Sequence, residues 1–145
     1  TPGYTGGQKH DPSYREVCTG TTGHAEAVQN AFDPAVISFR ELLEVFFSIH
    51  DPTTLNYQDA DYGTQYRSAI FYHDEEQRRL AEESKAELAK SKPFRENIVT
   101  EIVPASEFYP AEEYHQKYYQ KNPLRYRYYR AGCGRDERLK QLWGK

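Results

Sequence analysis

The chain of 145 residues contains no methionine, only two cysteines and one tryptophan. Because it has no initiator residue, we expect that a segment once preceded Thr1. The two cysteines, Cys18 and Cys133, are too few for a disulfide scaffold, which favours redox chemistry or a free buried thiol. No apolar run reaches the roughly 20 residues that a spanning helix needs, and no signal peptide is visible. We therefore expect a cytoplasmic protein with no membrane partner.

Charge is not strongly biased to either sign. The net charge of −3 gives no general argument for binding to nucleic acid or to a membrane surface. Aromatic residues make up 14% of the chain, with thirteen tyrosines, so much of the core must consist of rings with a polar end. The length predicts a single domain over residues 1–145, which we expect to act as a monomer.

The hydrophobic pattern predicts strands and helices in alternation, joined by long polar loops. We expect strands at residues 24–33, 66–73 and 97–103, and helices at 38–49, 75–90 and 110–122, with Ser38 and Glu41 at capping-box spacing. Residues 1–23 and 50–65 are predicted loops. This order predicts an α+β fold, namely a two-layer α/β sandwich with a ferredoxin-like core, long loops and an irregular C-terminal tail.

A metal site would need three or four ligands at compatible spacing. Cys18 and His24 could supply two of them. The other histidines are scattered along the chain, at His10, His50, His73 and His115. No metal site is predicted.

A basic, tyrosine-rich segment covers residues 114–130. It holds five Lys or Arg residues and six tyrosines but no acidic residue, a composition that can bind single-stranded nucleic acid. Alternatively, the rings cover a small core and the long basic side chains lie over them. The rest of the chain is acidic, so we predict no nucleic-acid partner and keep a non-catalytic binding protein as the alternative function.

Cys133 is flanked by Gly132 and Gly134, with Arg130 and Arg135 nearby. Positive charge favours the thiolate form of a cysteine, and glycines allow the chain to move. Such a thiol suits thiol–disulfide exchange. An ordinary surface cysteine fits the same residues.

Five segments in order resemble the peptide methionine sulfoxide reductases of the A class, which reduce the S epimer of methionine sulfoxide. They are GYTGG (3–7), YREVCTGTTGHAE (14–26), HDPTTLN (50–56), GTQYRSAIF (63–71) and FYPAEEYHQKYY (108–119), and the tail GCGRDERLKQLWG (132–144) is similar to the end of many bacterial members. The family's nucleophile lies in a Gly-Cys-Phe-Trp segment that this chain does not contain. The resemblance therefore implies that the N-terminal strand and nucleophilic helix are absent.

The resemblance assigns catalytic roles to four residues of this sequence. Glu26 would be the acid that protonates the sulfoxide oxygen, and Tyr14 and Tyr66 would donate hydrogen bonds to that oxygen. Tyr66 would also line the pocket for the substrate's methyl group, and Asp61 would hold the polar network on the substrate side. From the residues alone, Glu26 shares a predicted strand face with Val28 and Phe32, and apolar surroundings raise a carboxyl pKa. Taken by itself, a single glutamate on a strand is more often exposed.

The remaining assignments concern thiols and substrate binding. His24 would support Glu26 and contribute to substrate binding, and Cys18 is interpreted as a small packed residue. Cys133 would be the resolving thiol, with thioredoxin or another dithiol as the reductant and no metal or organic cofactor. A variant of this hypothesis is a paralogue without the nucleophile that only binds oxidised methionine.

Overall fold

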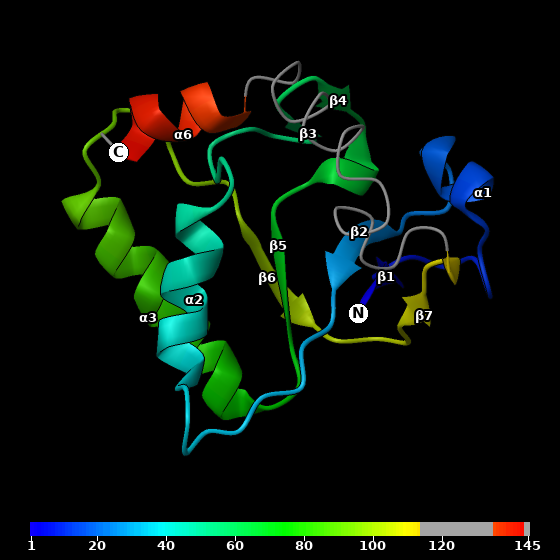
Figure 1. Cartoon of the computed structure of the whole chain (residues 1–145), viewed down its shortest axis with the longest axis horizontal. Coiled ribbons are helices and arrows are strands. Elements are labelled where there is room, and N and C mark those ends of the chain that lie inside the picture. Colours follow the sequence, from blue (N-terminus) through cyan, green and yellow to red (C-terminus); the bar gives the residue numbers. More distant parts are fainter. Residues whose placement is uncertain (114–134, 144–145) are drawn as a thin grey trace.

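The structure, a computed structural model, describes residues 1–113 and 135–143. Short strands and helices alternate along the chain (Figure 1), which confirms the α+β prediction at that level. The elements are β1 (Pro2–Thr5), α1 (Tyr14–Cys18), β2 (Ala25–Val28), α2 (Phe39–Ser48), β3 (Tyr57–Gln58), β4 (Asp61–Tyr62), the 3₁₀ turn η1 (Thr64–Tyr66), β5 (Ala69–Tyr72), α3 (Glu75–Ser91), β6 (Glu101–Pro104), β7 (Tyr109–Pro110) and α6 (Arg135–Trp143).

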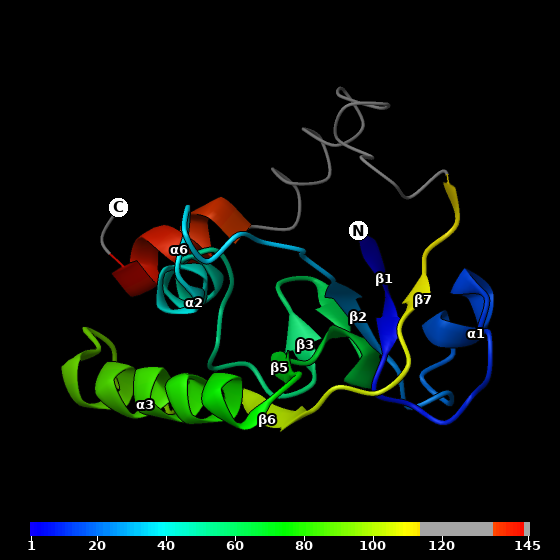
Figure 2. The same ribbon diagram turned by 90° about the horizontal axis from the view of Figure 1, so that it is seen from below.

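The described strands form three small sheets. The first is antiparallel in the order β2-β1-β7, and its register places Tyr4 opposite both Glu26 and Tyr109. Strands β3 and β4 form an antiparallel hairpin. Strands β5 and β6, which α3 connects in the sequence, pair in parallel. Figure 2 shows the first sheet and α1 on one side of the molecule and α2, α3 and α6 on the other, with β5 and β6 between them.

Two clusters of apolar side chains form the described core. In the larger one, Leu43 and Phe47 of α2 pack against Ile70 of β5 and Ala81 of α3. The capping box predicted at the start of α2 is present: the Ser38 hydroxyl accepts a hydrogen bond from the Glu41 amide, and the Glu41 carboxylate accepts one from the Ser38 amide. The smaller cluster contains Tyr4, Val17 and Ala111, with Tyr14 packed against it.

Several predicted boundaries differ from the observed ones. The strand expected at residues 24–33 ends at Val28, and Phe32 instead stacks on Phe39 with ring centroids 6.3 Å apart. The helix expected from residue 110 does not begin there, because Tyr109 and Pro110 form β7 beside β1. Residues 114–122 of that predicted helix lie outside the described residues.

The N-terminal 23 residues are not the single loop that their composition predicts. They contain β1 and α1, and α1 begins with a complete capping box between Ser13 and Glu16. The Ser-x-x-Glu spacing of this box is visible in the sequence and could have predicted the helix. Strand β1 has only four residues, too few for an alternating pattern to stand out.

Within residues 1–113 and 135–143, no helix combines the length and the apolar character needed to cross a membrane.

Candidate active site

Tyr14 is the first residue of α1, and its position is fixed by a carboxylate from a distant part of the chain. The Glu112 carboxylate accepts a hydrogen bond from the Tyr14 amide at 2.7 Å and another from the Tyr4 hydroxyl at 2.8 Å. A carboxylate at the beginning of a helix satisfies an amide that has no partner within the helix. Glu112 thereby joins α1 to β1, the strand that lies beside Glu26.

Glu26 lies in β2, opposite Tyr4 of β1. Glu26 is exposed as a whole residue, but removal of water from its carboxyl, together with the negative charge of Asp61, raises the pKa of Glu26 to about 7. The direction and its main cause, desolvation, follow the expectation for a proton donor, but the two residues expected to exclude water from the carboxyl were wrong. Val28 is 62% exposed and Phe32 lies beyond the strand, so these two residues do not form an apolar wall around the carboxyl.

Asp61 and Tyr66 come from one compact stretch of chain. Strands β3 and β4 pair around a tight turn in which Asp59 has a positive φ of 54°, and Asp61 follows in β4. The turn η1 then begins and places Tyr66 beside β2. Burial and the negative charges of Glu26 and Asp61 raise the pKa of Tyr66 to about 12, so its hydroxyl remains protonated at neutral pH.

The Tyr14 hydroxyl lies in the same electrostatic environment. A hydrogen bond with the Cys18 side chain, then burial and the nearby Cys18, Tyr66 and Glu26 groups, raise the pKa of Tyr14 well above its usual value. The structure thus brings Tyr14, Glu26, Asp61 and Tyr66 together. Cys18 is not the packed residue that we expected: it is exposed and belongs to this group of side chains.

His24 has a structural role rather than the predicted contact with substrate. It is 2% exposed, its Nδ1 accepts a hydrogen bond from the Gly7 amide at 3.1 Å, and its Nε2 donates to the Lys9 carbonyl at 2.7 Å. Both ring nitrogens therefore hold the loop that follows β1, at Gly7 and Lys9, against the start of β2. A Cβ at Gly7 would lie 2.4 Å from the His24 amide nitrogen, so the loop can approach this closely only with glycine there.

Two predicted features fall outside the described residues. Cys133 and the basic, tyrosine-rich segment 114–130 both lie in the range that the structure does not describe, so the roles assigned to them stay predictions. Among the described residues, no group of three or more His, Cys, Asp or Glu side chains could hold a metal ion. Cys18 and His24 in particular do not form a pair of ligands, because both His24 nitrogens bond to the backbone.

The chemical capacity of the group follows from its protonation states. A carboxyl with a pKa of about 7 is present in both forms near neutral pH and can give up a proton to a bound oxygen. Two phenols in the same group of side chains remain protonated, so each keeps a hydroxyl that can donate a hydrogen bond. The site is suited to weakening a bond to oxygen by protonating the oxygen as that bond breaks.

Comparison with known proteins identifies the family. The family model described as peptide methionine sulfoxide reductase matches residues 1–145. The chain belongs to this family. It is 53% identical over 143 residues to the peptide methionine sulfoxide reductase MsrA of Bacillus licheniformis, a match that covers 99% of this chain and 79% of the relative.

Two solved structures of Mxr1 from Saccharomyces cerevisiae are similar to this one. Mxr1 from Saccharomyces cerevisiae in reduced form is 43% identical, with a TM-score of 0.79 over 84% of this chain and 70% of that one. Mxr1 in complex with Trx2 is 31% identical, with a TM-score of 0.54 over 78% of this chain and 61% of that one. The resemblance drawn from the sequence motifs is thus confirmed at the level of the family.

Sequence reasoning missed Glu112 as a residue that positions the site. Glu112 lies in the motif FYPAEEYHQKYY and in the helix predicted over residues 110–122, but the sequence pattern indicated no role for it. Only the contact between Glu112 and Tyr14, 98 positions apart in the chain, shows its role. No local sequence pattern predicts such a pairing.

Proposed function

We propose that this member of the peptide methionine sulfoxide reductase family reduces methionine S-sulfoxide, free or in proteins, to methionine by a thiol-dependent reaction. The observation that supports the proposal is the Glu26 carboxyl, whose pKa is raised to about 7 by desolvation and then by the negative charge of Asp61. The same carboxyl acts on the pKa values of Tyr14 and Tyr66, so the four groups share one site. In the proposed site, Tyr14 and Tyr66 donate hydrogen bonds to the sulfoxide oxygen and Glu26 protonates it. The negative charge of Asp61 disfavours ionisation of Glu26, so that the carboxyl stays protonated closer to neutral pH.

The proposed reaction oxidises the enzyme's thiols in two stages, and a dithiol then reduces them again. A thiolate attacks the sulfoxide sulfur while Glu26 protonates the oxygen, so that an S–S bond forms and the S–O bond breaks to release hydroxide. Hydroxide then attacks the cysteine sulfur, and methionine leaves with the electron pair of the S–S bond, which leaves the cysteine as a sulfenic acid. A second thiol then displaces water from the sulfenic acid and forms a disulfide. A dithiol finally reduces that disulfide by thiol–disulfide exchange. The family resemblance places the attacking thiol in a Gly-Cys-Phe-Trp segment, a string that the printed residues do not contain.

The first experiment is an intact-mass measurement on the protein expressed from its complete gene. The protein is incubated without reductant with excess S-epimer methionine sulfoxide, and with the R epimer as the control. Loss of two hydrogens with the S epimer alone is expected if a disulfide forms after one turnover. An unchanged mass together with measurable binding of the S epimer would instead support a paralogue that only binds oxidised methionine.

Cys133→Ser is expected to spare the first turnover and to block recycling. The sulfenic acid still forms in this variant, but the resolving thiol that converts it to a disulfide is missing. Methionine formed per enzyme should therefore stop near one equivalent with thioredoxin as reductant, whereas the parent continues. Sustained thioredoxin-driven turnover in the variant would show that Cys133 is not the resolving thiol. The Mxr1 complex with Trx2 supports thioredoxin as the class of reductant.

The remaining expectations from the sequence are proposals of the same kind. We propose that the protein acts as a monomer in the cytoplasm and uses neither a metal nor an organic cofactor. We also propose that its three described sheets belong to a two-layer α/β sandwich with a ferredoxin-like core. The similarity to the reduced Mxr1 structure supports the mixed α/β arrangement on which this last proposal is built.

A further inference from the structure

Two side chains on either side of Tyr66 bind the segment that joins Tyr14 to Glu26. Gln65, only 4% exposed, donates from Nε2 to the Cys18 carbonyl at 3.3 Å. Arg67 donates from one terminal nitrogen to the Gly23 carbonyl at 3.1 Å and from the other to the Thr64 carbonyl at 2.9 Å. The Cys18 and Gly23 carbonyls both lie in residues 18–23, the segment that connects the end of α1 to the beginning of β2.

The backbone around Gln65 is shaped to admit this side chain. Gly63 has a φ of 140°, and a Cβ at that position would lie 2.3 Å from Gln65 Oε1. Gly20, with a φ of 75°, faces the same oxygen across the interface, where a Cβ would lie 3.6 Å away. Among the described residues this oxygen has no hydrogen-bond partner, so its burial costs free energy.

Arg67 completes the arrangement from the other side of Tyr66. Its Nε pairs with the Glu101 carboxylate at 3.3 Å, and its side chain is only 13% exposed. The guanidinium therefore joins three parts of the chain: η1, the start of β2 and β6. Arginine is suited to this task because its planar group offers five donors in a fixed geometry.

We propose that Gln65 and Arg67 form a clamp that sets the position of Tyr66 relative to Tyr14 and Glu26. Neither residue touches the reacting atoms; both are positioning residues that act through Tyr66. The clamp fixes η1 on the 18–23 segment at two points, one beside the helix that carries Tyr14 and one beside the strand that carries Glu26. The effect of the clamp on rate rests on the proposed function, whereas its effect on geometry does not.

The first test is a double-mutant cycle in the protein expressed from its complete gene. Gln65→Leu is expected to lower kcat/KM for methionine S-sulfoxide by about 10-fold, a coupling typical of residues in contact. In a Tyr66→Phe background the same change should cost less than about twofold, because the hydroxyl that Gln65 positions is already gone. Equal losses in both backgrounds would overturn the clamp.

Thr100→Val provides the matched control for this cycle. Thr100 is 1% exposed and shares a hydrogen bond with Ser68 at 2.8 Å, so the change also removes a buried polar contact without altering side-chain size. It is expected to lower stability while leaving kcat/KM within about twofold, in either background. A general loss of rigidity would affect both Gln65→Leu and Thr100→Val alike and would contradict the proposal.

The second test does not depend on activity. The ring-carbon NMR signal of Tyr66 in the 145-residue chain should shift with a midpoint near pH 7, because the Glu26 charge acts on Tyr66. Gln65→Leu should reduce the size of this shift by about twofold or more, since the Coulomb effect falls as the groups separate, and Thr100→Val should not. An unchanged shift in Gln65→Leu would overturn the clamp. An inactive parent protein would contradict the proposed function alone, and the NMR result would still decide the clamp.

Discussion

Glu26→Gln is expected to slow the chemical step by roughly 100-fold or more, the usual scale for a positioned general acid. Glutamine keeps the shape of the side chain and can donate a hydrogen bond, but it cannot transfer a proton to the sulfoxide oxygen. The measurement is a single-turnover rate of methionine formation from the S epimer. Glu44→Gln is the control, because Glu44 is exposed on α2 and should leave the rate unchanged.

The pH dependence of the rate gives a second, independent test of Glu26 as the proton donor. Since the pKa of Glu26 is raised to about 7, the protonated acid persists to neutral pH and is lost above it. The single-turnover rate of the parent should therefore fall by about tenfold per pH unit on the alkaline side of pH 7. The Glu26→Gln variant should lack this fall. A parent rate that shows no such decline would contradict the role of Glu26 as the acid.

Stability measurements separate a catalytic effect from unfolding. A carboxyl whose pKa is raised by folding stabilises the fold at pH values below its pKa in the unfolded chain. That contribution is lost as the pH rises through about 7, the pKa of Glu26 in the folded protein. Glutamine carries no charge to be repelled by Asp61, so Glu26→Gln should not reduce the free energy of unfolding at pH 8. A slow variant that remains as stable as the parent would assign the loss to chemistry.

The sequence predicts best the elements that have strong local signals. Helix α2 was predicted within one residue at each end because Ser38 and Glu41 mark its start and its apolar residues recur at helical spacing. The helix predicted at residues 75–90 likewise matches α3 within one residue, and the Asp74 side chain caps its start. Strands β1, β3, β4 and β7 were missed because two to four residues are too few for an alternating pattern to be recognised.

The candidate site was predictable only through the family motifs. The resemblance selected Tyr14, Glu26, Asp61 and Tyr66, and the structure brings these four together. Their surroundings were not predictable, because they depend on contacts between distant segments. The roles of Glu112 on Tyr14 and of Gln65 on Cys18 follow from three-dimensional proximity, which one sequence does not specify.

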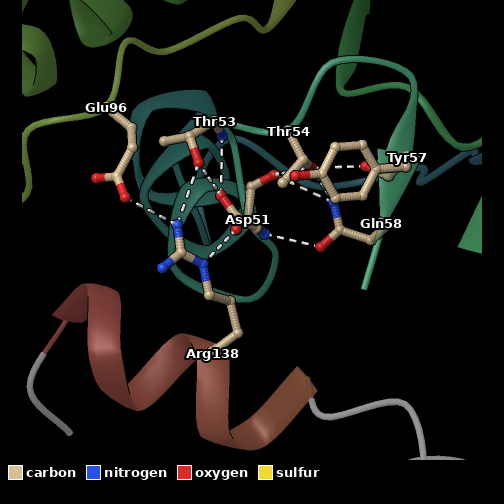
Figure 3. A network of polar contacts seen from close by, with 7 residues as sticks. All are labelled: Asp51, Thr53, Thr54, Tyr57, Gln58, Glu96 and Arg138. Atoms are coloured by element: carbon tan, nitrogen blue, oxygen red, sulfur yellow. Dashed lines mark hydrogen bonds and ion pairs between the residues drawn. The ribbon is translucent and has the colours of Figure 1, made fainter. Parts of the chain in front are cut away.

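A further long-range contact fixes α6 to the body of the protein. Figure 3 shows Arg138 of α6 reaching Asp51, whose carboxylate is 2% exposed and accepts from Arg138 Nε at 2.6 Å. The Thr53 amide and hydroxyl donate to the other carboxylate oxygen at 2.9 and 2.5 Å. Burial alone would raise the pKa of Asp51, but the hydrogen bonds from Thr53 and Arg138 outweigh it and hold this pKa below its usual value.

Asp51→Asn is expected to lower the free energy of unfolding by about 2 kcal/mol at pH 7. Removing one partner of a buried pair costs roughly 3–5 kcal/mol, and the 31% exposure of Arg138 reduces this figure because water can still solvate the guanidinium. Glu96→Gln is the matched control. Glu96 contacts the same Arg138 at 3.4 Å but is 50% exposed, so its loss should lower the free energy of unfolding far less than Asp51→Asn does.

Urea denaturation of the 145-residue chain at two pH values provides the measurement. A carboxyl whose pKa is lowered by folding stabilises the fold at pH values above its pKa in the unfolded chain. This contribution is lost as the pH falls through its lower pKa in the folded protein. The difference between Asp51→Asn and the parent should therefore shrink at pH 3. A difference that stays the same at both pH values would show that the charge of Asp51 is not what holds the helix.

Fluorescence of Trp143 shows whether the loss is confined to α6. Trp143 is the single tryptophan of the chain and packs edge-to-face on Phe94, with ring centroids 5.3 Å apart. Leu142 beside it is 2% exposed, so α6 has apolar contacts as well as the Arg138 ion pair. If Asp51 anchors this helix, Asp51→Asn should shift the emission to the red at urea concentrations below the main transition. Emission that changes only together with the main transition would mean that the helix and the body unfold as one unit.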